Sequence, residues 1–119
     1  MIYVDGFVLP LAKDKLDAYR AIAQGAGNIW MEHGALAYKE LAADDMKAEN
    51  MVAFPAMIGA AENETVILAY IVYNNRAHRD EVNAKVMADE RLHALCDPNN
   101  MPFDCKRMAY GGFSAIVDL

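Results

Sequence analysis

The sequence predicts an α+β fold, a ferredoxin-like βαββαβ sandwich of which two copies pack sheet against sheet as a dimeric α/β barrel. Three observations lead to this fold class. A chain of 119 residues suits one domain with one core, here residues 1–119. The order of strand-like and helix-like segments follows the βαββαβ pattern. One segment has the composition of a strand with apolar residues on both faces, which helices on only one side of a sheet cannot cover.

The first strand is expected at residues 2–9, where β-prone residues dominate, and Pro10 is expected to end it. Side chains alternate between the two faces of a strand. We expect Val4, Gly6 and Val8 on the face toward the helices, because Gly6 would admit a close helix. The intervening residues then lie on the opposite face.

A helix is expected from about Asp14 to His33, because apolar residues recur there every three or four positions. Asp14 suits the N-cap, and Gly34 suits the left-handed position after the helix end. Gly25 and Gly27 each cost the helix about 1 kcal/mol relative to alanine. Close packing against a sheet would explain why they are tolerated.

The middle of the chain is expected to carry two further strands. A short strand at residues 35–41 is followed by an irregular acidic stretch and by a helical turn from Pro55 to Ile58. Residues 65–73 form an unbroken β-prone run without polar alternation. Such a run is typical of a strand that is covered on both faces.

The last third of the chain is expected to form a helix and a strand. Asn74 or Asn75 caps the helix, which ends near residue 91 and leaves Arg79 largely exposed. The final strand is expected at residues 107–117, interrupted by a glycine pair. Two helices then cover one sheet face, and a second copy of the chain is expected to cover the other face as a homodimer.

Charge and cysteine content limit the expected partners. Eleven basic and seventeen acidic residues give a net charge of −6, so neither nucleic acid nor an anionic membrane is an expected partner. No secretory signal or membrane-spanning stretch is evident, which indicates a cytoplasmic protein. In a reducing compartment Cys96 and Cys105 are expected to stay free thiols rather than to form a disulfide.

Short motifs spread along the chain resemble those of one protein family. They are Tyr3–Val8, Glu32–Leu36, Glu64–Val66, Lys85–Asp89, Met101–Asp104, Arg107–Met108 and Tyr110–Phe113. In this order they resemble the bacterial domain-of-unknown-function family 1428. The resemblance implies a dimeric α/β barrel and a small bacterial protein, and it implies no established activity. The chain departs from the family at Ala42-Ala43, Tyr70 and Cys105, where a Trp-Gly pair, a Trp and a Gly are usual.

Candidate acid–base groups are expected between the two sheets of the barrel. The side chains expected there are Tyr3, Asp5, Phe7, Tyr38, Glu40 and Tyr70, with Arg107 or Tyr110 from the last strand and Phe103 from the loop before it. Asp5 and Glu40 are candidate acids or bases, because desolvation raises a carboxyl pKa and a nearby cation lowers it. Alternatively, both carboxylates form buried pairs or bond the backbone at the dimer seam.

His33 is a third candidate base. Its place in the last turn of a helix is better explained by a capping role, because the C-terminal end of the helix dipole favours the charged form of histidine. Glu90 and His93 have the spacing of half a carboxylate-bridged metal site, but the chain has no second half, so no metal is expected. No cofactor-binding motif is present, and no cofactor is expected.

The loop at residues 97–105 is long for so small a domain. Met101 and Phe103 are two apolar anchors on either side of a rigid proline. Two interpretations remain open: the loop is a flap over the mouth of the barrel, or it is a strap that reaches across the partner chain.

These observations favour a cytoplasmic homodimer that binds a small organic molecule in an apolar cavity between its sheets and could transform it without a cofactor. The alternative is a non-catalytic interaction module. In that case Tyr3, Phe7, Tyr70 and Tyr110 fill the barrel interior and leave no room for a ligand.

Overall fold

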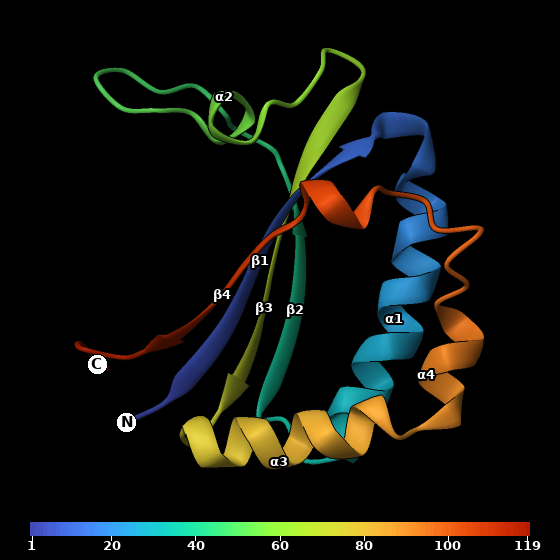
Figure 1. The fold of residues 1–119 in the computed structure, drawn as a ribbon. Coiled ribbons are helices and arrows are strands. Elements are labelled where there is room, and N and C mark those ends of the chain that lie inside the picture. The colour runs from blue at the N-terminus through green and yellow to red at the C-terminus, as the bar shows by residue number, and fades with distance from the viewer.

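The computed structural model describes all 119 residues and has an α+β fold (Figure 1). Four strands form one antiparallel sheet in the order β2-β3-β1-β4. Helices α1, α3 and α4 lie on one side of this sheet, whereas α2 and the loops around it extend beyond one end, away from those helices (Figure 1). The elements are β1 (Tyr3–Ala12), α1 (Leu16–Glu32), β2 (Ala37–Ala42), α2 (Phe54–Ile58), β3 (Glu64–Tyr73), α3 (Arg76–Met87), α4 (Glu90–Leu95) and β4 (Ala109–Ser114).

Strand β1 continues past Pro10, so the prediction that proline ends it is wrong. Pro10 pairs with Val66 inside the ladder between β1 and β3. The N–H of Lys13 donates to the carbonyl of Asn63 in the same register, so position 10 directs its nitrogen to the opposite side, toward β4. Strand β4 pairs only with Tyr3–Val8. Proline is tolerated because its missing N–H falls where no strand needs it.

Helix α1 confirms the predicted periodicity but not the predicted cap. Asp14 lies in a short 3-10 turn, and no side chain caps the start of α1. Gly34 has a φ of 113°, which confirms the expected glycine conformation after the helix end. Gly25 faces Leu95 of α4 rather than the sheet, whereas Gly27 faces the ring of Tyr38 on β2.

The predicted second helix is two helices, α3 and α4. Asn75 caps α3 by accepting a hydrogen bond from the N–H of His78, at 2.8 Å. Asp89 caps α4 by accepting one from the N–H of Arg91, at 2.9 Å. The cap at Asp89 permits a change of direction, and α4 runs back beside α1 (Figure 1).

The remaining boundaries differ by a few residues from those expected. The predicted helical turn after residue 54 is confirmed as α2, which ends at Gly59 with a φ of 65°. Strand β4 is shorter than expected at both ends: it begins later because residues Cys105–Arg107 form a 3-10 turn before it, and it ends at Ser114. None of the helices combines the length and the hydrophobicity that a bilayer-spanning helix needs.

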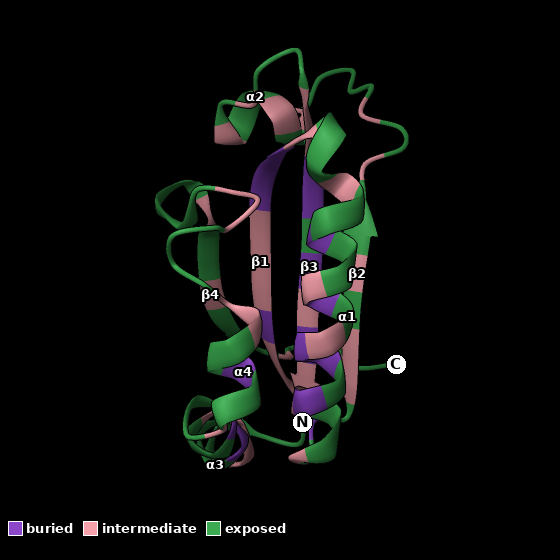
Figure 2. Cartoon of the chain, turned by 90° about the vertical axis from the view of Figure 1, so that its right-hand side faces the viewer, coloured by how far each residue is buried: buried purple, intermediate pink, exposed green.

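The two faces of the sheet are the reverse of those expected from the sequence. Tyr3, Asp5 and Phe7 face the helices, together with Ile67, Ile71 and Tyr73 of β3. Seen from the helix side, buried segments of β1 and β3 lie behind α1 and α4 (Figure 2). Gly6 lies on the outer face, where an added Cβ would be 3.3 Å from the ring of Phe113. The alternation of side chains along β1 could not show which face packs against the helices, because β1 carries apolar residues on both faces. The core comprises two clusters on the helix side, which contain Ala26, Ile29, Ala35, Ile71, Tyr73, Val82, Val86 and Leu92, and Leu9, Leu11, Tyr19, Ala23 and Ile67.

Candidate ligand-binding site

An apolar cavity of about 260 Å³ lies between the sheet and the helices α1 and α4. Strands β1, β2 and β3 supply one wall, the two helices supply another, and the loop after α4 supplies a third. Glu40 is the one charged residue among those that line it. The lining residues are Phe7, Tyr19, Ile22, Ala23, Ala26, Trp30, Tyr38, Glu40, Ala69, Ile71, Met87, Leu92, Cys96, Met101, Phe103 and Met108.

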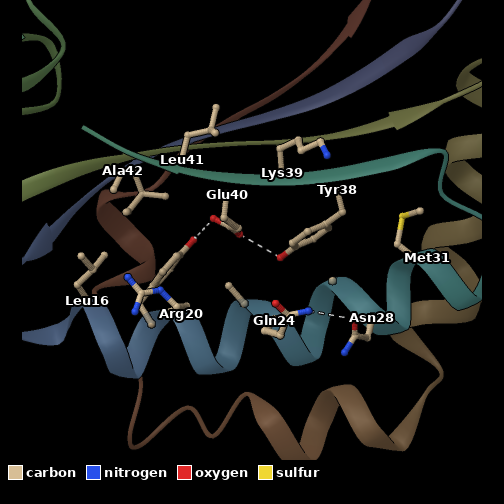
Figure 3. Close-up of a pocket in the computed structure, with 14 residues that line it drawn as sticks. Leu16, Arg20, Gln24, Asn28, Met31, Tyr38, Lys39, Glu40, Leu41 and Ala42 are labelled. Carbon is tan, nitrogen blue, oxygen red and sulfur yellow. Dashed lines mark hydrogen bonds between the residues drawn. The ribbon is translucent and has the colours of Figure 1, made fainter. Parts of the chain in front are cut away.

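A second, more polar hollow of about 450 Å³ is a groove between α1 and the edge strand β2 (Figure 3). Four residues line both the groove and the apolar cavity: Tyr19, Ala23, Tyr38 and Glu40. These side chains therefore form the partition between the two hollows. Glu40 is reached from the groove on one side and from the cavity on the other.

The carboxylate of Glu40 is held by two phenols and by no cation (Figure 3). Tyr19 donates its hydroxyl to Oε2 at 2.7 Å, and Tyr38 donates to Oε1 at 3.0 Å. Burial raises the pKa of Glu40, although the two hydrogen bonds oppose the rise. Burial and the neighbouring carboxylate also raise the pKa of each tyrosine, so both remain hydrogen-bond donors at neutral pH.

The backbone of α1 is shaped to fit the side chain of Tyr38. An added Cβ at Gly27 would lie 2.7 Å from the ring of Tyr38, well inside van der Waals contact. The absence of that carbon lets the ring lie against the helix. Trp30 packs against Tyr38 at 6.1 Å between ring centroids, and Phe103 packs edge-on against Tyr19 at 5.5 Å. Aromatic contacts thus fix both phenols that hold Glu40.

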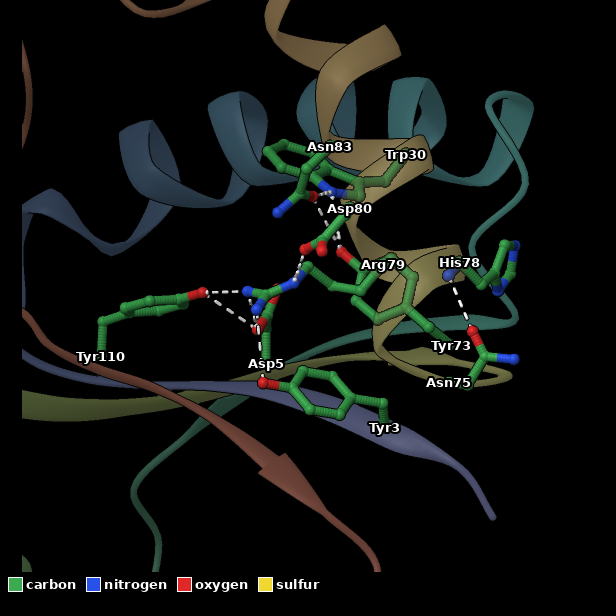
Figure 4. Close-up of polar contacts among 10 residues, drawn as sticks. All are labelled: Tyr3, Asp5, Trp30, Tyr73, Asn75, His78, Arg79, Asp80, Asn83 and Tyr110. Atoms are coloured by element: carbon green, nitrogen blue, oxygen red, sulfur yellow. Dashed lines mark hydrogen bonds and ion pairs between the residues drawn. The ribbon is translucent and has the colours of Figure 1, made fainter.

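Asp5 lies in a separate polar cluster near β4 (Figure 4). It is 1% exposed and accepts a hydrogen bond from Arg79 at 2.9 Å and one from the hydroxyl of Tyr110 at 3.0 Å. Arg79 also donates to the hydroxyl of Tyr110 at 2.6 Å and to that of Tyr3 at 3.3 Å. Tyr3, Asp5 and Tyr110 therefore come together as expected, but under helix α3 rather than between two sheets.

The expectation that Arg79 is largely exposed is wrong. Its side chain is 13% exposed, and its guanidinium lies over the ring of Tyr3 at 5.0 Å. It reaches back from the first turns of α3 to neutralise the buried carboxylate of Asp5. The sequence signal that could have found this pairing is Asp5 itself, because a carboxylate inside an apolar strand requires a cationic or hydrogen-bonding partner.

Three other candidate residues, His33, Arg107 and Tyr70, lie away from both sites. Nε2 of His33 lies within hydrogen-bond distance of Asp89, at 2.8 Å from Oδ2, and this contact joins the end of α1 to the cap of α4. Hydrogen bonds from Arg91 and then from His33 hold the pKa of Asp89 well below its usual range. Arg107 binds Glu64 at 2.8 Å and the carbonyl of Gly59, and so ties the start of β4 to β3.

Tyr70 lies on the outer face of the sheet, next in sequence to the buried Ala69. It therefore cannot join Tyr3, Phe7 and Tyr110 in filling one interior, because those three are on the helix face. Phe7 lines the cavity and stacks on Tyr110 at 5.1 Å between ring centroids. Phe7 thus separates the cavity from the cluster around Asp5.

The loop at residues 97–105 folds onto its own chain, which differs from both expected roles. Met101 and Phe103 line the cavity on the helix side of the sheet. Phe103 also packs against the second core cluster. The loop therefore closes a hollow within one chain, where Phe103 packs against Tyr19 of α1.

The sequence analysis missed several lining residues on the helices. Trp30, Met87, Leu92 and Cys96 line the cavity, and burial raises the pKa of the Cys96 thiol. The break before α4 turns Leu92 and Cys96 toward α1. The sequence indicated one continuous helix there, so this change of direction was missed. Both cysteines are free. No three acidic, histidine or cysteine side chains come close enough together to hold a metal ion.

Comparisons with known proteins give a family and a fold. The family model described as "Protein of unknown function (DUF1428)" matches residues 2–105. The chain is 42% identical over 118 residues to the uncharacterized protein YbaA of Escherichia coli K12, with 99% of each chain covered. YbaA of Shigella flexneri matches to the same extent.

Two solved structures share the fold at low sequence identity. An uncharacterized NIPSNAP domain protein from Burkholderia xenovorans has a TM-score of 0.58 and 12% identity, covering 95% of this chain and 93% of that one. A nipsnap family protein with unknown function from Agrobacterium tumefaciens has a TM-score of 0.57 and 16% identity, covering 94% and 86%. At these identities the similarity concerns the fold alone.

Proposed function

This chain belongs to the DUF1428 family, and from that premise we propose that it binds a small apolar organic molecule in the cavity between the sheet and helices α1 and α4. The observation that carries the proposal is a hollow of about 260 Å³ with apolar walls and one carboxylate, that of Glu40. The hollow is open to solvent on one side, so a small molecule can enter it. Ligand sites typically combine apolar walls with a few polar groups that fix orientation.

Glu40 would be the acid–base group in any reaction at this site. Burial raises its pKa, which brings a carboxylate closer to the range where it exchanges protons at neutral pH. Asp5 is held by Arg79, and His33 by Asp89, so neither is free to act on a molecule in the cavity. A transformation without a cofactor would use Glu40 to accept and return a proton.

Fluorescence of the single tryptophan provides a direct test, because Trp30 lines the cavity. The neutral dye N-phenylnaphthylamine should bind and receive energy transfer from Trp30. Ala26→Leu and Ala69→Leu each fill the cavity, from α1 and from β3, and should weaken dye binding about tenfold or more. Circular dichroism identifies any variant that does not fold. If one of the two cavity-filling variants fails to fold, the other still tests the proposal.

Leu68→Ser is the matched control, because Leu68 precedes Ala69 but lies on the outer face and is 40% exposed. It should leave dye binding unchanged. Loss of binding in Leu68→Ser but not in Ala26→Leu or Ala69→Leu would place the dye on the outer face and overturn the proposal.

A second proposal concerns that outer face, which we expect a second copy of the chain to cover as a ferredoxin-like dimeric α/β barrel. Leu41, Leu68 and Phe113 are 45%, 40% and 62% exposed there. Four strands about 4.8 Å apart, with residues rising about 3.3 Å each, give a face on the order of 600 Å². A stable interface buries about 800 Å² per partner. The exposed apolar residues Met51, Val52 and Met57 around α2 extend this face toward that area.

Light scattering tests the homodimer by mass. The chain should give about twice its 13.2 kDa, and Leu68→Glu should give a folded monomer. Met31→Glu is the control, because Met31 is similarly exposed at 45% but lies on α1. A monomeric unaltered chain would contradict the dimer and leave the cavity proposal standing.

The free thiols support the further expectation of a cytoplasmic location.

A further inference from the structure

The cavity contains one acidic group and no basic group. Among its lining residues only Glu40 carries a charge, and the two phenols bound to it stay protonated. The basic residues of the adjoining groove are directed elsewhere. Arg20 is exposed and paired with Asp17 at 2.8 Å, and Lys39 extends from the opposite face of β2 (Figure 3). A negatively charged ligand would therefore meet repulsion and no counter-charge.

The carboxylate of Glu40 has acceptor capacity to spare. Each of its oxygens accepts one hydrogen bond from a phenol, whereas a carboxylate oxygen can accept about two. The two phenols fix the orientation of the carboxylate, so a ligand need not pay to order it. A donor in the cavity would complete its hydrogen bonding.

The walls around this carboxylate are rich in aromatic rings. Phe7, Tyr19, Trp30, Tyr38 and Phe103 all line the cavity. The faces of aromatic rings attract cations. The net charge of −6 adds a long-range attraction for cations at the whole-chain level.

We propose that the ligand is a small apolar molecule that carries one ammonium group, which Glu40 and the surrounding rings bind. This inference rests on the proposed ligand-binding function and adds the charge of the ligand to it. A neutral molecule would leave the burial of the carboxylate uncompensated, whereas an ammonium group neutralises it and donates to its free acceptor positions. The apolar remainder fills the rest of the cavity.

Three naphthalene compounds of matched shape test the charge. Naphthylethylamine, naphthylethanol and naphthylacetate are each used at neutral pH to displace N-phenylnaphthylamine, followed by energy transfer from Trp30. The amine should displace the dye at about tenfold lower concentration than the alcohol, and the acid should be weakest. Glu40→Gln should reduce the affinity of the amine to about that of the alcohol, because the amide carries no charge to pair with the ammonium group.

Glu49→Gln is the matched control, because it removes the same charge from an exposed loop residue. It should preserve the preference for the amine. An equal loss in Glu49→Gln and Glu40→Gln would show that the amine is attracted by net charge, which overturns the proposal. A readout without a variant is available from pH, because the preference for the amine should diminish as Glu40 becomes protonated.

The outcomes separate this inference from the function on which it rests. Equal displacement by the amine and the alcohol would refute an ammonium ligand while the cavity proposal stands. Failure of the dye itself to bind in the cavity would remove the proposed function, and the inference with it.

Discussion

Two carboxylates on the same face of one sheet differ in what surrounds them. Asp5 on β1 contacts the guanidinium of Arg79 and lines neither the apolar cavity nor the groove. Glu40 on β2 contacts two phenols, has no cation, and lines a hollow on each side. A paired buried charge is satisfied within the chain, and removal of either partner destabilises the fold. An unpaired, half-buried charge beside a cavity can still gain from a ligand, and this difference separates a structural site from a binding site.

The largest expected effect is a loss of stability when Asp5 is changed to asparagine. Asp5→Asn removes the buried carboxylate that faces Arg79, whose guanidinium then keeps only the exposed Asp80, at 2.9 Å, as a charged partner. Removal of one partner of a buried ion pair costs about 3 kcal/mol. Glu40→Gln should cost about 1 kcal/mol, because the amide oxygen still accepts from one phenol, the amide NH2 donates to the hydroxyl oxygen of the other, and no cation is left unpaired. Urea unfolding measures both. A smaller loss in Asp5→Asn than in Glu40→Gln would reverse the comparison.

A second prediction uses two glycines in helix α1. In Gly27→Ala the new carbon would lie 2.7 Å from the body of the Tyr38 ring, which must move and strain its bond to Glu40. The clash should outweigh the gain of about 1 kcal/mol in helix propensity and give a net loss of about 1 kcal/mol.

Gly25→Ala is the control for the same change in the same helix. Its new carbon would approach the terminal methyl of Leu95 at 2.8 Å, and a flexible side-chain end can shift. Gly25→Ala should therefore be neutral or slightly stabilising in thermal unfolding. Equal losses in the two variants would mean that Tyr38 is not held by α1.

The pH dependence of stability gives a smaller effect with a defined sign. Burial raises the pKa of Glu40 in the folded chain above its ordinary value of 4.5, so the folded state binds this proton more tightly than the unfolded state. The free energy of unfolding, relative to that of Glu40→Gln, should therefore rise as pH falls through the folded pKa and level off below 4.5. Water in the groove screens the charge, so the change should be less than about 1.4 kcal/mol per unit of raised pKa. A difference that falls with falling pH would contradict the prediction.

The sequence predicted the order of strands and helices because that order depends on local periodicity, as in α1 and β3. It predicted a carboxylate beside phenols at Glu40 because Tyr38 and Glu40 alternate onto one face. It could not predict which face this was, because the valines on the other face of β1 are as apolar as Tyr3 and Phe7. It could not predict that Arg79 pairs with Asp5, since 74 residues separate them and only the packing of α3 brings them together.

The final and smallest expected effect is a change in the pKa of Glu40, which depends on the phenol of its own site and not on the phenol beside Asp5. The hydrogen bond from Tyr19 lowers the pKa of Glu40, so Tyr19→Phe should raise that pKa further and shift the pH-dependent part of the stability curve to higher pH. Carbon NMR of the Glu40 carboxyl group, assigned with Glu40→Gln, measures the shift. Tyr110→Phe is the control, because it removes a phenol from Asp5 and should leave Glu40 unchanged. An unchanged pKa in Tyr19→Phe would mean that this phenol only occupies space, and Glu40 would then lack the fixed orientation that a ligand site requires.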